Sequence, residues 1–445
     1  MRHKISRRDM LKVMGAAGLA SFAPIPNVSA LDFVNRMQEF RGSFTWWRVP
    51  PDTTIEQEQL DAFDAAVAEL MPNVTISYEV MGYGEMLDVL RTAVRGGGGP
   101  DVAVLPILWG VEFAAGGFLR PLSPADLGYT NEQFWPRALN SNLWEGEYYG
   151  VPTNNETMTF IWNKRLFEAA GLDPEVPPAT WQEVVEFSNQ IFTNTGASGY
   201  GIVARQNHGN TPFRNMPLLW AYGASVLDET DPLPQYNEVR INSPEAAAAL
   251  QVLYDIYVRD RSAPSSALDN SQAENRELFI AERVAMMIDH PTALRIISQN
   301  NPELAPFMGF AKFPEGPVRR AAVFGGSNIH IFNRANEDVL PAIKAFCTLR
   351  CNPEWANRLA WFSNPGNRDG FDNEWFQTRL EQIPFLDVAT SMLEFGIPFP
   401  VIPEATEIMN LIIPALLQNV LTERMTIADA LAEAERAVEE VMARA

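Results

Sequence analysis

Strand-like and helix-like segments alternate through the first hundred residues of this 445-residue chain. Residues 44–49, 74–80 and 101–105 are short and rich in β-branched or aromatic residues, whereas 54–71 and the segment from 84 carry apolar residues at helical spacing. A helix that connects two strands of one sheet returns the chain to the same end, so the strands are parallel. The sequence therefore predicts an α/β fold with a parallel sheet, whose ligand site lies beyond the carboxyl ends of the strands.

Large aromatic and charged residues stand where these predicted strands end. Trp46, Trp47 and Arg48 close the first strand, and Trp109 follows the third. Aromatic rings supply apolar faces to a ligand, and indole or guanidinium N–H groups supply hydrogen bonds. We expect these four residues to contact a ligand; the alternative for Trp109 is burial between helices, and the alternative for Arg48 is a surface salt bridge.

The stretch 144–181 combines a turn, an extended run and two helices. Its extended run, 151–162, carries Asn154, Asn155 and Glu156 near its start. Buried hydrogen-bonding side chains need partners or a ligand, because leaving them unpaired costs free energy. This polar cluster is typical of a binding cleft.

The ordered segments YYGVP and FIWNKRLFEAAGLDPEVPPATWQEV in this stretch resemble the extracellular solute-binding proteins of ABC importers, in particular the sugar-binding family 1 that includes maltose-binding protein. The resemblance extends over nearly all of residues 40–442. It implies a periplasmic-binding-protein-like α/β fold, with two lobes joined by a hinge of several chain crossings and a ligand cleft between them. The expected N-terminal lobe is 31–155 with 320–352, and the expected C-terminal lobe is 156–319 with 353–445.

The resemblance also implies site residues. Phe213 matches a position where an aromatic ring packs on a sugar, and the segment GGSNIHI offers backbone amides. Family members often have a small residue and a Trp where this chain has Asp289 and His290, which leaves the role of His290 open. The full expected ligand-binding set is Trp46, Trp47, Arg48, Trp109, Asn154, Asn155, Glu156, Phe213, Arg214, Asp289, His290, Gly325, Ser327 and Arg368.

The function implied is a periplasmic substrate-binding protein, expected to be a monomer, that captures a mono- or small oligosaccharide and delivers it to separate permease subunits of an ABC importer. Met409 replaces a sugar-stacking Trp of maltose-binding protein, which weakens a preference for malto-oligosaccharides. A non-sugar solute such as a polyol, glycerol phosphodiester or osmolyte is the alternative, and an acidic sugar is favoured if Arg48, Arg214 and Arg368 converge. The rival class is a glycan-cleaving enzyme that uses Glu156 and Asp289. No catalytic residue, cofactor or metal is expected.

The first thirty residues resemble a twin-arginine export signal, with Arg7 and Arg8 before an apolar run and a small-residue cleavage site that ends at Ala30. No cysteine is near that site to carry a lipid, so we expect a soluble, non-lipidated periplasmic protein. The whole chain carries −21, and the leader has five basic residues against one acidic residue, so residues 31–445 carry −25. Such a charge makes nucleic acid an unsuitable partner.

Two further features of the sequence do not indicate a functional site. Cys347 and Cys351 stand four residues apart in a helical pattern, too far for a disulfide in a regular helix, and are expected to be packing residues. The glycines at 96–99 follow a helix and precede a strand. A phosphate-binding loop has the opposite order, so these glycines do not indicate one.

Overall fold

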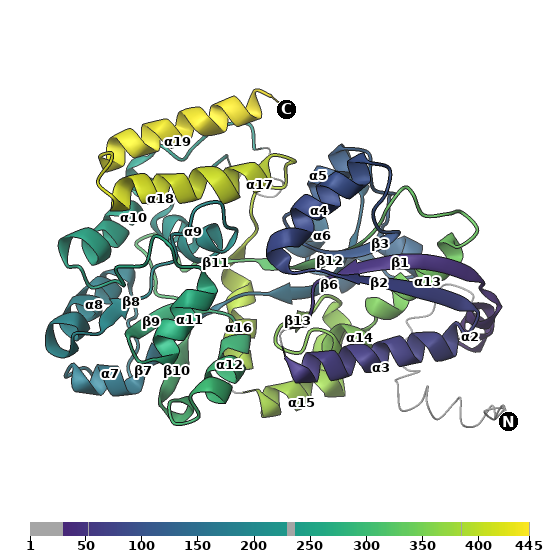
Figure 1. Ribbon diagram of the computed structural model, residues 1–445, viewed down its shortest axis with the longest axis horizontal. Helices are drawn as coiled ribbons and strands as arrows, with labels where there is room; N and C mark the ends of the chain where they lie inside the picture. The colour runs from purple at the N-terminus through teal and green to yellow at the C-terminus, as the bar shows by residue number, and fades with distance from the viewer. Residues whose placement is uncertain (1–29, 52, 229–235, 384, 445) are drawn as a thin grey trace. The chain divides into compact units, whose positions relative to one another are not determined.

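The computed structural model describes residues 30–51, 53–228, 236–383 and 385–444. The chain forms two compact units: the first contains the chain up to Asn155 and Gly325–Pro384, and the second contains Glu156–Phe324 and Phe385–Ala445 (Figure 1). The expected export signal lies outside the described residues except for Ala30, where the first described helix begins.

The change of unit at Asn155 falls where the sequence analysis placed it, but the assignment of 353–384 to the second lobe is wrong. These residues belong to the first unit because their short strand β13 (Asn364–Pro365) pairs antiparallel with β6 (Val151–Glu156). The expectation for 320–324 is wrong as well, since this segment belongs to the second unit.

The first unit is built on a six-stranded sheet with the order β13-β6-β12-β3-β1-β2. Strand β1 runs parallel to β2 and β3, as the helical connections require, whereas β12 runs antiparallel to β3. The predicted parallel sheet is therefore a mixed one. Its remaining strands are β1 (Gly42–Arg48), β2 (Val74–Val80), β3 (Val102–Pro106) and β12 (Gly325–Ile331).

Helices cover both faces of this sheet, with α3 and α4 on opposite sides (Figure 1). The larger core lies on the α3 side, where the rings of Trp46, Phe63 and Phe346 meet edge to face with centroids 4.9–6.1 Å apart. The principal helices of the unit are α2 (Ala30–Glu39), α3 (Thr54–Leu70), α4 (Tyr83–Arg95), α5 (Gly110–Ala115), α6 (Pro136–Asn140), α13 (Leu340–Arg350), α14 (Pro353–Arg358) and α15 (Glu374–Gln382).

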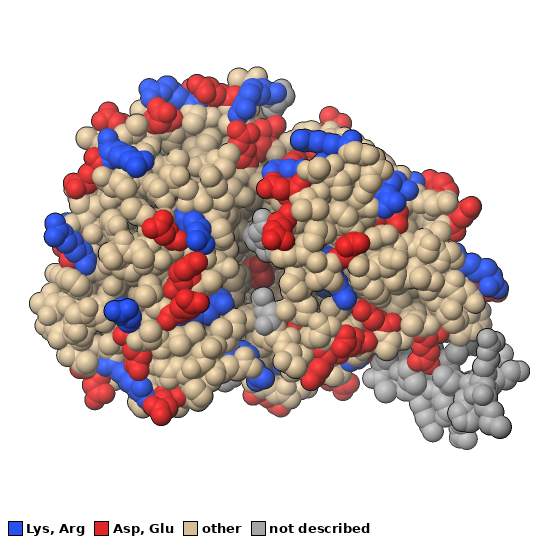
Figure 2. All heavy atoms as spheres, in the orientation of Figure 1, with Lys and Arg blue, Asp and Glu red and all other residues tan. Residues whose placement is uncertain are grey.

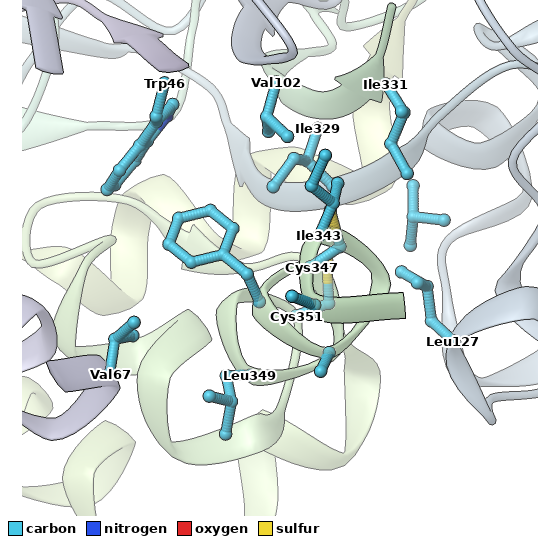
Figure 3. Close-up of a cluster of buried hydrophobic side chains, with 14 of the residues drawn as sticks. Trp46, Val67, Val102, Leu127, Ile329, Ile331, Ile343, Cys347, Leu349 and Cys351 are labelled. Carbon is cyan, nitrogen blue, oxygen red and sulfur yellow. The ribbon is translucent and has the colours of Figure 1, made fainter. Parts of the chain in front are cut away.

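Both cysteines lie in this core. Cys347 and Cys351 are free thiols, fully buried among Ile343, Leu349 and their neighbours (Figure 3). Burial raises the pKa of Cys351 to about 12, so the thiol stays protonated at neutral pH. The expected packing role fits this environment.

The second unit has a four-stranded sheet with the order β10-β7-β9-β8. The single extended run predicted over 151–162 is instead two strands, β6 in the first sheet and β7 (Thr159–Asn163) in the second. Strand β7 lies antiparallel between its two neighbours, and β8 is parallel to β9. The other strands are β8 (Ser198–Tyr200), β9 (Val284–Asp289) and β10 (Met308–Ala311).

The helices of the second unit begin at the caps that the sequence suggests. Asn163 accepts backbone N–H bonds at the start of α7, and Thr180 with Glu183 forms a capping box at α8. Among the described residues, none of the helices combines the length and apolar character needed to cross a membrane. The principal helices are α7 (Lys164–Ala169), α8 (Trp181–Thr195), α9 (Asn210–Tyr222), α10 (Pro244–Tyr254), α11 (Gln272–Ile280), α12 (Thr292–Asn300), α16 (Leu386–Met392), α18 (Ile413–Leu421) and α19 (Ile427–Met442).

A fully buried histidine joins three segments of the first unit. His330 on β12 directs Nδ1 to the carbonyl oxygen of Tyr149 at 2.8 Å. Its ring packs against Gly110 and Gly150, where a side chain would come within 2.6 Å of it. Burial lowers the pKa of His330 to about 4, so the ring is neutral at pH 7 and Nδ1 donates the hydrogen bond.

This environment predicts an acid-sensitive first unit. Because the folded-state pKa of His330 lies below its ordinary value of about 6.5, the unfolded state binds the proton more tightly. The free energy of unfolding should hold above pH 6.5 and fall by on the order of 3 kcal/mol as the pH approaches 4. In His330→Asn, which can keep the bond to Tyr149, this decline should be absent. Urea unfolding at several pH values measures how the free energy of unfolding changes with pH in wild type and in His330→Asn. An equal decline in the two proteins would contradict the prediction.

Candidate functional site

The chain leaves the first unit after Asn155, at the end of β6, and returns to it at Gly325, the first residue of β12. These two strands are neighbours in the sheet, and the carboxyl end of β3 lies beside them because Ser327 pairs with Pro106. We call this border the crossing edge of the first unit. The expected site residues along it are Trp109, Asn154, Asn155, Gly325 and Ser327.

The polar side chains of this edge differ in their burial and in their hydrogen-bond partners. Asn155 is fully buried and donates to the carbonyl oxygen of Pro365 at 3.1 Å, so it fastens β6 to β13. Asn154 and Ser327 are half-buried; the amide of Asn154 donates to the Ser363 hydroxyl at 3.1 Å. The last two therefore keep polar atoms near solvent, and they are the stronger candidates for ligand contact.

Gly326, between Gly325 and Ser327, has a backbone geometry that favours glycine. Its φ is +130°, and an added Cβ would stand 2.2 Å from the carbonyl oxygen of Asn154. The Gly-Gly-Ser segment thus lets β12 begin in close contact with the end of β6.

The structure separates the two adjacent tryptophans of β1. Side chains alternate across a strand, so Trp46 enters the core on the α3 side and Trp47 points to the opposite face. The prediction that Trp46 contacts a ligand is wrong, because its ring is 2% exposed and surrounded by Phe63 and Phe346. Trp47 is also buried, at 9% exposure.

Arg48 points to the same face as Trp46 and is held there. Its guanidinium lies 4.7 Å from the ring centroids of both Trp46 and Tyr78, and Nη1 is 3.4 Å from Asp64. These contacts give Arg48 a structural ion pair, and its expected ligand contact stays a prediction.

Two other expected residues have unexpected surroundings. Trp109 directly precedes α5 at the carboxyl end of β3, as predicted, but only 2% of it is exposed. Arg368 is exposed, and its guanidinium lies 5.1 Å from the ring centroid of Trp135. Three arginines were considered as a converging set, and each has its own partner instead.

The second unit has a corresponding crossing edge. The chain enters it at Glu156, three residues before Thr159, which pairs with Asp289 at the carboxyl end of β9. The half-buried Glu156 and His290 lie near this border. We call it the crossing edge of the second unit.

Asp289 is the electrostatic centre of this second edge. The carboxylate is 1% exposed and accepts hydrogen bonds from Arg214 Nη2 at 2.9 Å, Arg276 Nε at 2.9 Å and the His290 backbone N–H at 2.9 Å. Burial by itself raises the pKa of Asp289, but the charges of Arg276 and Arg214 outweigh it and bring the pKa to about 2. The carboxylate therefore stays ionised at neutral pH.

Arg214 is almost as deeply buried as its partner. It also donates from Nε to the Ile288 carbonyl oxygen at 3.1 Å and from Nη1 to Asn210 at 2.7 Å. The sequence analysis chose Arg214 and Asp289 separately, and the structure joins them as an ion pair. It missed Arg276, because an Arg on the half-exposed helix α11 looks like any surface residue in the sequence.

Phe213 is the aromatic candidate on this unit. It is half-buried, although the other residues from 211 to 221 are buried, and its ring meets Phe399 edge to face at 4.9 Å and 90°. Met409, in contrast, is fully buried in a π-helical turn, Ile408–Ile412. The partly exposed ring of Phe213 could pack on an apolar ligand surface.

The Asp289 cluster predicts a large loss of stability in Asp289→Asn. Removing the carboxylate charge leaves two neighbouring guanidiniums, one of them fully buried, so we expect a cost of about 3–5 kcal/mol in the free energy of unfolding. Glu433→Gln, which breaks an exposed pair with Arg436, should cost less than about 0.5 kcal/mol. Denaturant unfolding compares the two, and similar small effects would contradict a central role for Asp289.

Similar proteins are known. The family model described as bacterial extracellular solute-binding protein matches residues 53–347. A binding protein of Brucella abortus is 26% identical over 258 residues, 57% of this chain, and the match covers only 59% of that protein. The mannitol-binding protein of Pseudomonas aeruginosa is 25% identical over 411 residues, which are 85% of this chain and 88% of that protein.

Solved structures show the same architecture. An ABC transporter solute-binding protein from Thermotoga lettingae, crystallised with α-D-tagatose, superposes with a TM-score of 0.76. The match covers 90% of this chain and 99% of that chain at 24% identity. At this identity the comparison shows the fold, which is that of two-lobed periplasmic binding proteins.

Proposed function

Since the chain belongs to the family of bacterial extracellular solute-binding proteins, we propose that it captures a carbohydrate, either a mono- or a small oligosaccharide, and delivers it to an ABC importer. The observation that carries the proposal is the placement of half-buried polar side chains at the crossing edges, Asn154 and Ser327 in the first unit and Glu156 and His290 in the second. The half-buried ring of Phe213 adds an aromatic surface, and it is adjacent in sequence to Arg214, which binds Asp289 at the second edge. Planar polar groups bind hydroxyls, and an aromatic face packs on the C–H surface of a sugar ring.

The state of the arginines supports a neutral ligand. Arg48 and Arg214 pair with carboxylates of their own unit, and Arg276 also pairs with Asp289. A guanidinium that already has a carboxylate partner gains less from an acidic ligand, because the new contact competes with the existing one. Of the three arginines in the expected set, Arg368 alone has an aromatic ring instead of a carboxylate as its partner among the described residues. With the other two paired, neutral hydroxylated solutes suit these edges better than uronates or glycerol phosphates.

A neutral polyol is the second candidate. The relative from Pseudomonas aeruginosa, which is similar over most of both chains, is named for mannitol. Polyols present the same hydroxyl groups as sugars but no ring face, so they would depend less on Phe213.

The proposal includes the absence of catalysis. Glu156 and Asp289 were the two carboxylates considered for glycan cleavage, and Asp289 is occupied by Arg214 and Arg276 with a pKa of about 2. A general acid needs a proton near neutral pH, which a carboxyl group with that pKa does not hold.

The expected partners are the small solute and separate permease subunits in the inner membrane, with the protein acting as a monomer in the periplasm. Acidic and basic side chains are interspersed over the face of each unit drawn in Figure 2. With a net charge of −21, this distribution supports the expectation that nucleic acid is not a partner.

Ligand binding should raise the melting temperature. At about 100 times the dissociation constant, a bound solute stabilises the protein by roughly 2.7 kcal/mol, which is a shift of several degrees. We expect calorimetry to detect the binding of neutral sugars or polyols and no binding of uronates or glycerol phosphates. The bound sugar should be recovered uncleaved. Cleavage that disappears in Glu156→Gln would instead establish an enzyme.

Phe213 supplies the residue-level test. Phe213→Ala should weaken binding of a sugar by about 2 kcal/mol, roughly thirtyfold, because an aromatic anchor is lost. The melting point without ligand should change little, since the ring is only half-buried. The matched control is Phe192→Ala, which removes a 38% exposed ring on α8 and should leave affinity unchanged. Unchanged affinity in Phe213→Ala would remove this residue from the site.

The export route has its own test. The paired arginines of a twin-arginine signal are expected to be required, so Arg7→Lys combined with Arg8→Lys should abolish export. Fractionation of expressing cells measures the result. Mature double variant in the periplasm would show that another route is used.

A further inference from the structure

Ser363 is a half-buried serine beside the crossing edge of the first unit, and it is not among the expected site residues. It directly precedes β13, which pairs with Asn154 and Asn155 of β6. Its Oγ accepts a hydrogen bond from Asn154 Nδ2 at 3.1 Å. Among the described residues, the hydroxyl has no acceptor for its own hydrogen, so it can donate that hydrogen to a ligand.

The same contact orients the amide of Asn154. With Nδ2 bound to Ser363, the other polar atom of this half-buried side chain is Oδ1, an acceptor. The Thr153 hydroxyl lies 3.4 Å from Oδ1, but its single hydrogen has a closer acceptor in the carbonyl oxygen of Ser327 at 2.9 Å. Oδ1 of Asn154 therefore keeps its lone pairs for a ligand.

A buried arginine holds the backbone of Ser363 in place. Arg379 on α15 is fully buried, and its Nη1 donates to three carbonyl oxygens of the turn 360–363, including that of Ser363 at 2.7 Å. Its Nη2 donates to Asn357 Oδ1 at 2.6 Å, and the Asn357 amide donates to the carbonyl oxygen of Gly370 at 2.8 Å. Movement of the turn would leave buried, charged N–H groups without acceptors, which costs free energy.

The short strand β13 fixes the chain on the other side of Ser363. Asn155 Nδ2 donates to the carbonyl oxygen of Pro365 at 3.1 Å. Gly366 approaches β6 so closely that an added Cβ would stand 2.4 Å from the carbonyl oxygen of Pro152. The serine and its amide partner are thus held in position before a ligand arrives, which lowers the entropic cost of binding.

We propose that Ser363 is a further ligand-binding residue, and that it forms with Asn154 a pair that binds neighbouring hydroxyl groups of the solute. The Ser363 hydroxyl donates to one ligand oxygen, and Asn154 Oδ1 accepts from a ligand hydroxyl. A sugar or polyol offers both a lone pair and an O–H group, whereas a fully methylated sugar satisfies only the serine. This inference rests on the proposed function. Arg379 is a positioning residue, since it acts on the ligand only through Ser363.

Calorimetry with D-mannitol, D-tagatose and maltose as probes tests the pair. For a probe that binds wild type, Ser363→Ala and Asn154→Ala should each weaken binding by about tenfold, because each removes a hydrogen bond and releases its partner. The double variant should lose much less than the hundredfold, approximately, that two independent contacts would give. Ser363→Thr, which keeps the hydroxyl, should retain most of the affinity.

The matched control removes another half-buried serine hydroxyl. Ser198 on β8 pairs with Val284 at the amino end of β9, the end opposite to Asp289, so Ser198→Ala should bind the probe like wild type. Unchanged affinity in Ser363→Ala, while wild type binds the probe, overturns this inference and leaves the proposed function standing. Failure of wild type to bind any of the probes counts against the proposed function, and the ligand contact of Ser363 falls with it.

The bond between the two side chains has a test without ligand. In a heteronuclear NMR spectrum, the side-chain amide signal that disappears in Asn154→Ala belongs to this residue. Its protons should exchange with water more slowly in wild type than in Ser363→Ala, because Nδ2 loses its acceptor in the variant. The melting point should change little, since Arg379 binds the backbone carbonyl of residue 363 and not its hydroxyl. Equal exchange in the two proteins would show that Ser363 does not hold the amide, and the pair would be refuted.

Discussion

The backbone hydrogen bonds of residues 151–163 belong to two different sheets, and both units depend on these bonds. In β6 its N–H and C=O groups pair within the first unit, and in β7 they pair within the second. Only Thr157 and Met158 lie between the strands. A shift of one residue in either register would turn core side chains outward, so the position of the crossing is tightly determined. The polar residues at 154–156 lie at the crossing for this reason, although Asn155 is buried and only Asn154 and Glu156 are half-buried.

Alternation along the strands decides which candidates remain at these edges. In β1 it sends Trp46 and Arg48 to the core face, and in β6 it buries Asn155 while Asn154 stays half-buried. Residues of similar chemistry that are adjacent in sequence therefore have different roles. The aromatic ring of Phe213 remains partly exposed, although the helix around it is buried.

Much of the fold could be predicted because it depends on local patterns. The bounds of α3 and β2 follow the apolar periodicity, and the capping residues mark the starts of α7 and α8. The sequence could not reveal that 364–365 returns to pair with β6, since a two-residue edge strand has no pattern of its own. It could not reveal either that Arg214 and Asp289, 75 residues apart, neutralise each other, because ion pairing depends on tertiary structure. Such long-range pairings give several of the predicted ligand-binding residues a partner within their own unit.

The buried arginines show why the same residue type needs three different interpretations. Arg214 has a carboxylate, and Arg379 has carbonyl and amide oxygens, so each is compensated within its unit. Among the described residues, Nη1 of Arg350 has neither kind of acceptor, although the side chain is buried to a similar degree. Burial alone therefore does not tell how a buried cation is stabilised. The number and kind of acceptors around the guanidinium does, because the free-energy cost of burying charge has to be offset by some partner, whether that partner belongs to the chain or comes from solution.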